Sequence, residues 1–333
     1  MKLTFSKESI SVRSAVILSI LSIAFALIAS WVGPEDLVVS LLPMAVSTGF
    51  LASLIHFECE KFKPLRFIAP IFVLIIDWIL NGFYSLGGII IVVSALMIFL
   101  TYEQQWSKVE SALTMSMVVA GLITLMFVVI GVQSSDGISV KEFYTELFEQ
   151  FKSEYVIYFE QAYSAMYEGM DVEPISSEYI IQMLDFIFGL IVAILFVSAF
   201  IFIGIATKIF AIVLNKCDSD KEKLNSWRFT PNPVYAYFYM VVELLTMFIS
   251  SELTTFNLCI SNLSLIFMPL FWYMGIKAAG KLINERKKLA MPTTFTVLCV
   301  VAIAVLFPRI LSYIGVFYCI ISSKINLFQR KGD

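Results

Sequence analysis

Long runs of apolar residues, separated by short polar segments, dominate this chain. Ten such runs cover residues 14–32, 36–56, 67–82, 86–101, 110–133, 180–214, 232–250, 255–276, 292–307 and 309–323. A helix needs about 20 apolar residues to cross the hydrocarbon core of a bilayer, and most of the runs are long enough. The pattern therefore predicts an all-α bundle of about ten transmembrane helices.

Two stretches leave the number of helices open. Residues 67–101 are interrupted by Asn81-Gly82 and Gly87-Gly88, and residues 292–323 by Pro308-Arg309. Each fragment has only about 15–17 residues, near the lower limit for a span, and the interruptions are typical of turns. We interpret both stretches as helical hairpins, which gives ten spans. Single long helices there would reduce the number to eight or nine.

The composition supports an integral membrane protein. The 333 residues are 59% hydrophobic and 15% charged, with a mean hydropathy of +0.87. Soluble domains are about 45–50% apolar and about 25% charged. A soluble enzyme with one anchor, a disordered chain and a basic nucleic-acid binder are therefore excluded, and the lipid bilayer is the expected environment. The five cysteines and the single histidine form no CxxC motif or Cys/His cluster, so no metal or other cofactor is expected.

The charged residues predict an orientation. If the N-terminus is cytoplasmic, 19 of the 23 basic residues fall on the cytoplasmic side of a ten-span topology. Cytoplasmic loops of membrane proteins carry an excess of Lys and Arg. We therefore expect a multi-pass protein of the plasma membrane with both termini in the cytoplasm.

One long segment, residues 134–178, is expected outside the cell. It holds ten acidic residues, and its aromatic and apolar residues recur at steps of three and four, as in an amphipathic helix. This helix could lie at the outer interface and pack on the bundle, or form a lid over an outward-facing cavity. The expected organisation is an N-terminal bundle of about five helices (1–133), the outer segment (134–178) and a C-terminal bundle of about five helices (179–333).

Few polar residues are predicted near the middle of the membrane. They are Asp77, Asn81, Glu243 and Asn262, and Asn81 shares a helix face with Asp77 because it follows by four residues. Carboxyls inside a membrane are costly and mark functional sites, so these residues are candidates for substrate or proton binding. The alternative is that protonated carboxyls bond to Asn or Ser and hold helices together. No catalytic motif is present, and we expect no enzyme activity.

Small residues repeat every fourth position in the first two predicted helices. The first set is Ser22, Ala26 and Ser30, and the second is Ala45, Gly49 and Ser53. Small residues at this spacing allow helix backbones to approach closely. The two faces could pack within the chain, or the first helix could dock another membrane protein.

Three segments resemble the YybS-like family of bacterial membrane proteins, which has no assigned activity. They are Trp227-Arg228-Phe229-Thr230-Pro231 before a span, Phe271-Trp272-Tyr273-Met274-Gly275-Ile276 before a basic loop, and Gly315 in the last span with the ending Phe328-Gln329-Arg330-Lys331. The family often has an acidic residue shortly after this glycine, where this chain has Val316-Phe317-Tyr318. The N-terminal half of the family looks like the substrate-binding subunits of energy-coupling-factor vitamin transporters. The resemblance implies that the small-residue face of the first helix meets a partner transmembrane protein.

Two functions follow as expectations. The first is binding or transport of a small solute at an outward-facing site in the N-terminal bundle, near Asp77 and Asn81. The second is a non-transporting scaffold or regulatory partner in the cell envelope, suggested by the small-residue faces.

Overall fold

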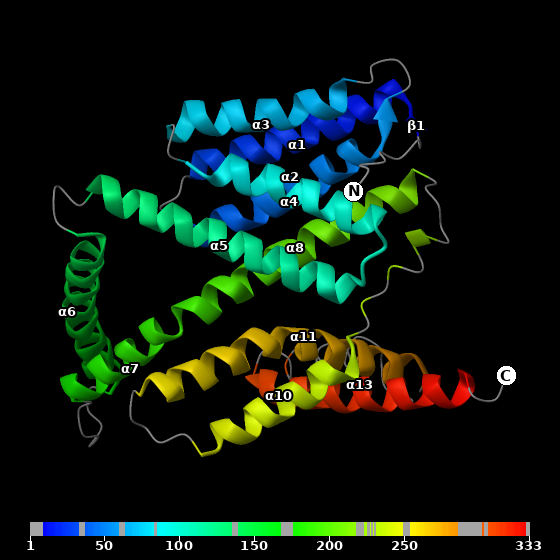
Figure 1. The fold of residues 1–333 in the computed structure, drawn as a ribbon. Helices are drawn as coiled ribbons and strands as arrows, with labels where there is room; N and C mark the ends of the chain where they lie inside the picture. Colours follow the sequence, from blue (N-terminus) through cyan, green and yellow to red (C-terminus); the bar gives the residue numbers. More distant parts are fainter. Residues whose placement is uncertain are drawn as a thin grey trace. The chain divides into compact units, whose positions relative to one another are not determined.

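The computed structural model describes residues 9–32, 37–59, 64–82, 85–134, 139–167, 176–217, 223–224, 227, 229, 231–248, 254–285, 302 and 306–330. Within them the regular secondary structure is helical apart from one pair of two-residue parallel strands, β1 (Ser9–Ile10) and β2 (Glu58–Cys59). The helices, labelled in Figure 1, are α1 (Val12–Val32), α2 (Leu37–His56), α3 (Leu65–Asn81), α4 (Gly87–Glu103), α5 (Lys108–Ser134), α6 (Val140–Met166), α7 (Ser177–Gly189), α8 (Ile191–Lys216), α10 (Pro233–Thr246), α11 (Thr255–Glu285) and α13 (Pro308–Arg330).

Five of these helices are long and apolar enough to cross a membrane. They are α1, α2 from Val39, α5, α8 and α11 to Lys281; α4, α10 and the Pro308–Ser322 part of α13 are shorter apolar helices. The predicted helical fold is confirmed, and these five helices fit the prediction of several membrane spans. The number of ten spans and the orientation of the termini stay predictions, and the expected span 292–307 lies almost entirely outside the described residues.

The predicted hairpin at 67–101 is present. Helix α3 ends at Asn81, and Gly82 follows with φ of +80° and ψ of 173°, a positive-φ conformation that suits a residue without a Cβ. Helix α4 then begins at Gly87. The apolar run 180–214 instead forms two helices, because α7 ends at Gly189 and α8 begins at Ile191.

The chain forms two compact units that we describe separately. Unit 1 comprises residues 1–189 and 198–228, and unit 2 comprises residues 190–197 and 229–333. Helices α6 and α7 and most of α8 therefore belong with α1–α5, so the boundary differs from the expected division at 133 and 178.

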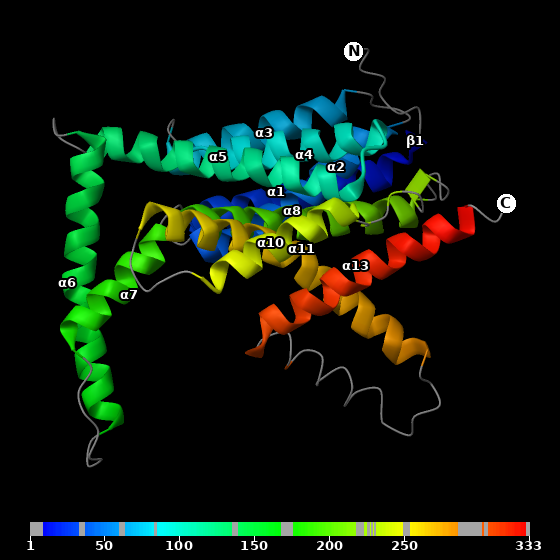
Figure 2. The same ribbon diagram turned by 60° about the horizontal axis from the view of Figure 1, so that its bottom comes forward.

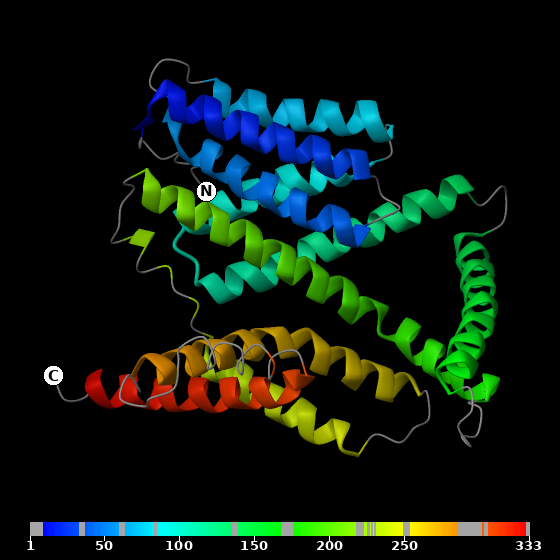
Figure 3. The same cartoon turned by 180° about the vertical axis from the view of Figure 1, so that it is seen from behind.

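In unit 1, four helices form the packed core. Helix α1 packs on α2 and α3, and α4 packs on α2 and α3, so the four lie side by side in both Figure 1 and the reverse view of Figure 3. Helix α6 runs crosswise to α5, as Figures 1 and 2 show. The Tyr144 hydroxyl fixes this junction by donating a hydrogen bond to the carbonyl of Phe127.

In unit 2, α10, α11 and α13 pack on one another. The backbones of α11 and α13 come into direct contact at two glycines. A Cβ added at Gly275 would overlap the carbonyl oxygen of Leu311, and one added at Gly315 would overlap the carbonyl oxygen of Phe271. Only glycine permits this approach, which is how small residues associate helices in membranes.

Candidate functional site

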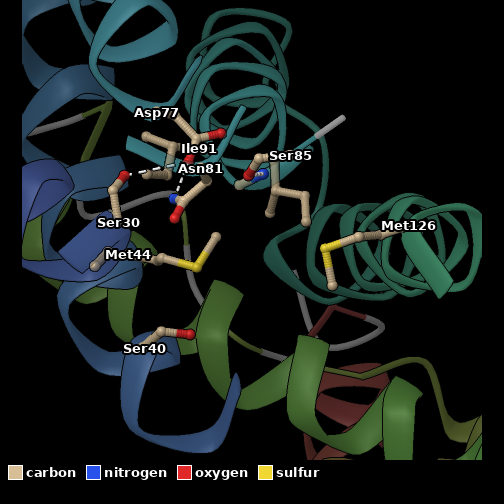
Figure 4. A pocket seen from close by; sticks show the side chains of 11 residues that line it. Ser30, Ser40, Met44, Asp77, Asn81, Ser85, Ile91 and Met126 are labelled. Atoms are coloured by element: carbon tan, nitrogen blue, oxygen red, sulfur yellow. Dashed lines mark hydrogen bonds between the residues drawn. The ribbon is translucent and has the colours of Figure 1, made fainter. Parts of the chain in front are cut away.

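Unit 1 contains a small cavity at the end of its helical core. The cavity lies where α1 and α3 end and α2 and α4 begin, and Met126 closes it from α5 (Figure 4). Its volume is about 30 Å³, and its lining residues are Ala29, Ser30, Ser40, Met44, Asp77, Asn81, Ser85, Gly87, Ile90, Ile91 and Met126. A water molecule needs about 10–15 Å³ by this measure, so the space suits one or two waters or a group of similar size.

Asp77 is the charged residue that lines the cavity, and it is only 4% exposed. Its Oδ1 accepts hydrogen bonds from Asn81 Nδ2 at 2.9 Å and from Ser30 Oγ at 3.2 Å. Its Oδ2 accepts a 2.7 Å bond from the backbone N–H of Gly88. Figure 4 shows the bonds to Ser30 and Asn81. The carboxyl thus acts only as an acceptor and joins α1, α3 and α4.

The bond to Gly88 places Asp77 at the N-terminus of α4. The first backbone N–H groups of a helix have no partner within it, and its N-terminus carries a partial positive charge. The N-cap residue of α4, Leu86, makes no side-chain cap, so Asp77 supplies this acceptor from the preceding helix. The glycines make room, because a Cβ at Gly88 would lie 3.0 Å from the Asp77 Cβ.

Asp77 lies nearer a helix end than we expected from the apolar run. It is in the last turn of α3, four residues before Asn81, because the chain turns at Gly82. Asn81 was expected on the same helix face as Asp77, and in the structure its amide donates a hydrogen bond to that carboxyl.

Glu243 belongs to unit 2, in the last turn of α10, and is also only 4% exposed. Its Oε1 accepts a hydrogen bond from the Ser264 hydroxyl of α11, and its Oε2 accepts one of 2.7 Å from the Tyr313 hydroxyl of α13. The buried Tyr239 of α10 faces the same carboxyl. Among the described residues, no Lys or Arg forms an ion pair with Glu243 or Asp77.

Asn262 is not part of the Glu243 cluster. Its Oδ1 accepts a 3.0 Å hydrogen bond from the backbone N–H of Ala193, in the first turn of α8, and its Nδ2 donates to the carbonyl of Leu258. Asn262 therefore caps the start of α8 from α11, at the break that divides the apolar run 180–214. This arrangement gives Asn262 a structural role in unit 2.

The small-residue faces of α1 and α2 lie inside unit 1. Ser22, Ala26, Ser30, Ala45, Gly49 and Ser53 are all buried. The Ser47 hydroxyl donates a 2.8 Å bond to the carbonyl of Ser22, which links α2 to α1. A Cβ at Gly49 would lie 2.7 Å from the carbonyl oxygen of Ala206, so α8 packs closely on α2 there. These faces thus serve packing within the chain.

A polar cluster around His56 was not predicted. His56 is 1% exposed, and its Nδ1 lies 2.9 Å from Oε1 of Glu103, whose Oε2 lies 3.0 Å from Nζ of Lys223. Aromatic rings enclose it, with Tyr102 and Phe210 at centroid distances of 5.5 and 6.0 Å from the imidazole. One sequence feature could have indicated this cluster. The only histidine, His56, and the glutamate Glu103 stand at the ends of neighbouring helices.

Trp227, from the first family-like segment, packs beside this cluster. It is 5% exposed, its ring lies 5.1 Å from that of Tyr102, and Nζ of Lys108 sits 4.7 Å above it. The tryptophan therefore anchors the segment after α8 to unit 1. This contact gives a packing reason for a tryptophan at that position.

Helix α6 forms the described part of the predicted amphipathic segment. It begins with a capping box between Ser139 and Glu142, and the bonds from Ser139 hold the pKa of Glu142 below its usual value. Lys152 pairs with Asp185 of α7 at 2.8 Å. Several apolar side chains of α6 remain exposed, namely Leu147, Phe151, Tyr155, Ile157, Tyr158, Phe159 and Met166. A helix is thus present over Val140–Met166, whereas residues 135–138 and 168–175 of the expected outer segment lie outside the described part.

Comparisons of the chain with protein-family models, with curated proteins and with solved structures found no match. The resemblance to the YybS-like family and to vitamin-transporter subunits therefore stays a prediction.

Proposed function

We propose that this protein binds a small polar solute in the cavity of unit 1 and serves as a solute-binding or transport protein of the plasma membrane. The observation that carries the proposal is the convergence of Asp77, Asn81 and Ser85 on one cavity. Ligand sites usually combine a small number of polar groups with an otherwise apolar lining.

The chemistry of Asp77 favours a solute with positive charge or hydrogen-bond donors. An ionised carboxylate offers about four acceptor positions, and three donors occupy three of them. One position on Oδ2 remains for a ligand. The cavity volume of about 30 Å³ restricts the bound group to the size of an alkali cation, an ammonium group or one or two waters.

The position of the cavity supports access from outside the cell. It lies at the helix ends that join α1 to α2 and α3 to α4. If the N-terminus is cytoplasmic, these helix ends are extracytoplasmic. The excess of basic residues then lies at the opposite helix ends, in the cytoplasm, as is usual for membrane proteins. A cysteine at Ser85, in a chain without its native cysteines, would then react in intact cells with a membrane-impermeant thiol reagent. Reaction only after the membrane is opened would place the cavity on the cytoplasmic side.

A thermal-shift screen on purified protein tests the binding itself. The probes are lithium, sodium, potassium, ammonium and methylammonium chlorides, at one ionic strength. A ligand that binds only the folded state raises the melting temperature. We expect a shift with at least one probe that is lost in Asp77→Asn and Asn81→Ala and kept in Ser116→Ala, whose buried hydroxyl bonds its own helix away from the cavity. A shift that persists in both cavity variants, or no shift with any probe, would contradict the proposal.

The scaffold alternative receives less support from the structure. Its motivating feature, the small-residue face of α1, packs on α2 and α3 of the same chain. A partner on α1 would have to contact the opposite, apolar face, which includes Ile17, Ile20 and Trp31.

A further inference from the structure

The two buried carboxyls are held by chemically different partners. Two of the three donors to Asp77, the backbone N–H of Gly88 and the amide of Asn81, can only donate at those contacts. Glu243 is bonded by two hydroxyls, from Ser264 and Tyr313. A hydroxyl can either donate or accept, depending on how it rotates.

This difference determines what happens when a proton arrives. A protonated Glu243 can donate to one hydroxyl and accept from the other, so both links to α11 and α13 survive. If Asp77 took up a proton, the Ser30 hydroxyl would be the one described partner that could change from donor to acceptor. Gly88 and Asn81 would still point hydrogens at the carboxyl.

The helix ends around the two carboxyls reinforce the contrast. Asp77 is bonded directly to the N-terminus of α4, whose partial positive charge favours a negative group. Glu243 lies in the last turn of α10, where the helix dipole disfavours a negative charge. Its described hydrogen bonds come from side chains, and none comes from a helix N-terminus.

We propose that Glu243 is an exchangeable proton site in unit 2, whereas Asp77 is a fixed acceptor. On uptake, a proton from water joins one oxygen of Glu243, the carboxylate becomes a neutral carboxyl, and the hydroxyl on that oxygen rotates to accept. Among the described residues, the titratable or charged groups that face the site are Tyr239 on α10 and Tyr313 on α13, with Arg309 acting on Tyr313. From α11 the facing group is the Ser264 hydroxyl. The proposal is independent of solute binding in unit 1.

Infrared difference spectroscopy tests this site. Full-length protein in lipid bilayers is compared at low and high pH within its range of stability. We expect the C=O stretching band of a protonated carboxyl that is lost in Glu243→Gln, shifted in Tyr313→Phe because one hydrogen bond is removed, and unchanged in Asp77→Asn. Identical spectra for wild type and Glu243→Gln, or loss of the band in Asp77→Asn instead, would overturn the proposal.

A chemical probe on the wild-type protein keeps the proposal testable if Glu243→Gln fails to fold. Dicyclohexylcarbodiimide enters membranes and adds a protonated carboxyl across its N=C bond, with no leaving group. Mass spectrometry should locate the adduct at Glu243, in a yield that rises as the pH falls, with Asp77 unmodified. An adduct at Asp77 but not Glu243, or no adduct at any pH, would count against an exchangeable proton at Glu243.

Discussion

The backbone N–H of Gly88 donates a 2.7 Å hydrogen bond to Asp77, so a side chain from the end of α3 caps the start of α4. The same carboxyl binds Ser30 of α1. Asp77 therefore stabilises the helical hairpin and lines the cavity at the same time. Variants at this position must be judged on both folding and binding.

Removing the Asp77 carboxyl should destabilise the protein. In Asp77→Ala the N–H of Gly88, the amide of Asn81 and the hydroxyl of Ser30 lose their common acceptor. Leaving buried donors unsatisfied costs about 1–3 kcal/mol, so we expect that loss in the free energy of unfolding. Denaturant unfolding in detergent measures it, with Ser116→Ala as the control. A wild-type stability for Asp77→Ala would show that the cap contributes nothing.

The crossing of α11 and α13 should tolerate no side chain at its glycines. Gly275→Ala and Gly315→Ala force the two backbones apart, and overpacking of this kind costs about 1–3 kcal/mol. Gly280→Ala on α11 is the matched control, because a Cβ there meets nothing within 4 Å. It should be neutral or stabilising by up to about 1 kcal/mol through helix propensity. Equal melting temperatures for Gly280→Ala and Gly315→Ala would refute the close crossing.

The His56 cluster should depend on the charge of Glu103. Glu103→Gln keeps the size of the side chain but leaves Lys223 without its carboxylate and weakens the contact with His56. Hydrogen bonds to charged groups contribute about 1.5–3 kcal/mol, and we expect a loss in this range or below it. Thermal unfolding measures the loss, and Glu110→Gln, on the exposed surface of α5, should leave stability unchanged. If both variants melt alike, the cluster is not a stabilising contact.

Lys152 should hold α6 on α7. In Lys152→Met the bonds to Asp185 and Glu149 are lost, so the amides of α6 should exchange hydrogen faster near neutral pH. Lys141→Met, at an exposed position of the same helix, should exchange like wild type.

The same pair of residues predicts a dependence on pH. Hydrogen bonds to Asp185 and then Glu149 raise the pKa of Lys152 above its ordinary value of 10.5. A raised pKa means that this stabilisation is fully present below the unfolded value and is lost as the pH rises through the folded value. The difference in melting temperature between wild type and Lys152→Met should therefore be constant near neutral pH and shrink above about 10.5. A difference that grows at alkaline pH would contradict the pairing.

Local patterns were sufficient to predict most of the helices. The turn at Gly82 and the start of α4 at Gly87 followed from glycine and asparagine between two apolar runs, and Asn81 was found on the same face as Asp77 from a spacing of four. A helix within residues 134–178 followed from a period of three and four residues, although its cap at Ser139 was not predicted. These features depend on interactions between residues close in the sequence.

Partners between distant helices could not be predicted in the same way. Nothing local indicates that Asp77 caps another helix, that Asn262 caps α8, or that Tyr313 bonds Glu243 across 70 positions of sequence. The burial of His56 likewise requires rings from α4 and α8 to close around it. In each case the energy comes from tertiary geometry, which a single sequence does not contain.

The glycine contacts between α11 and α13 have a mechanical consequence. At Gly275 and Gly315 the backbones of α11 and α13 touch, with no side chains between them that could repack. The two helices therefore form one rigid pair at this crossing. Glu243 joins α10 to this pair, because it accepts one hydrogen bond from Ser264 of α11 and one from Tyr313 of α13. Separating α10 from this pair would therefore require breaking the hydrogen bonds of one buried carboxyl, without disturbing the glycine contacts between α11 and α13.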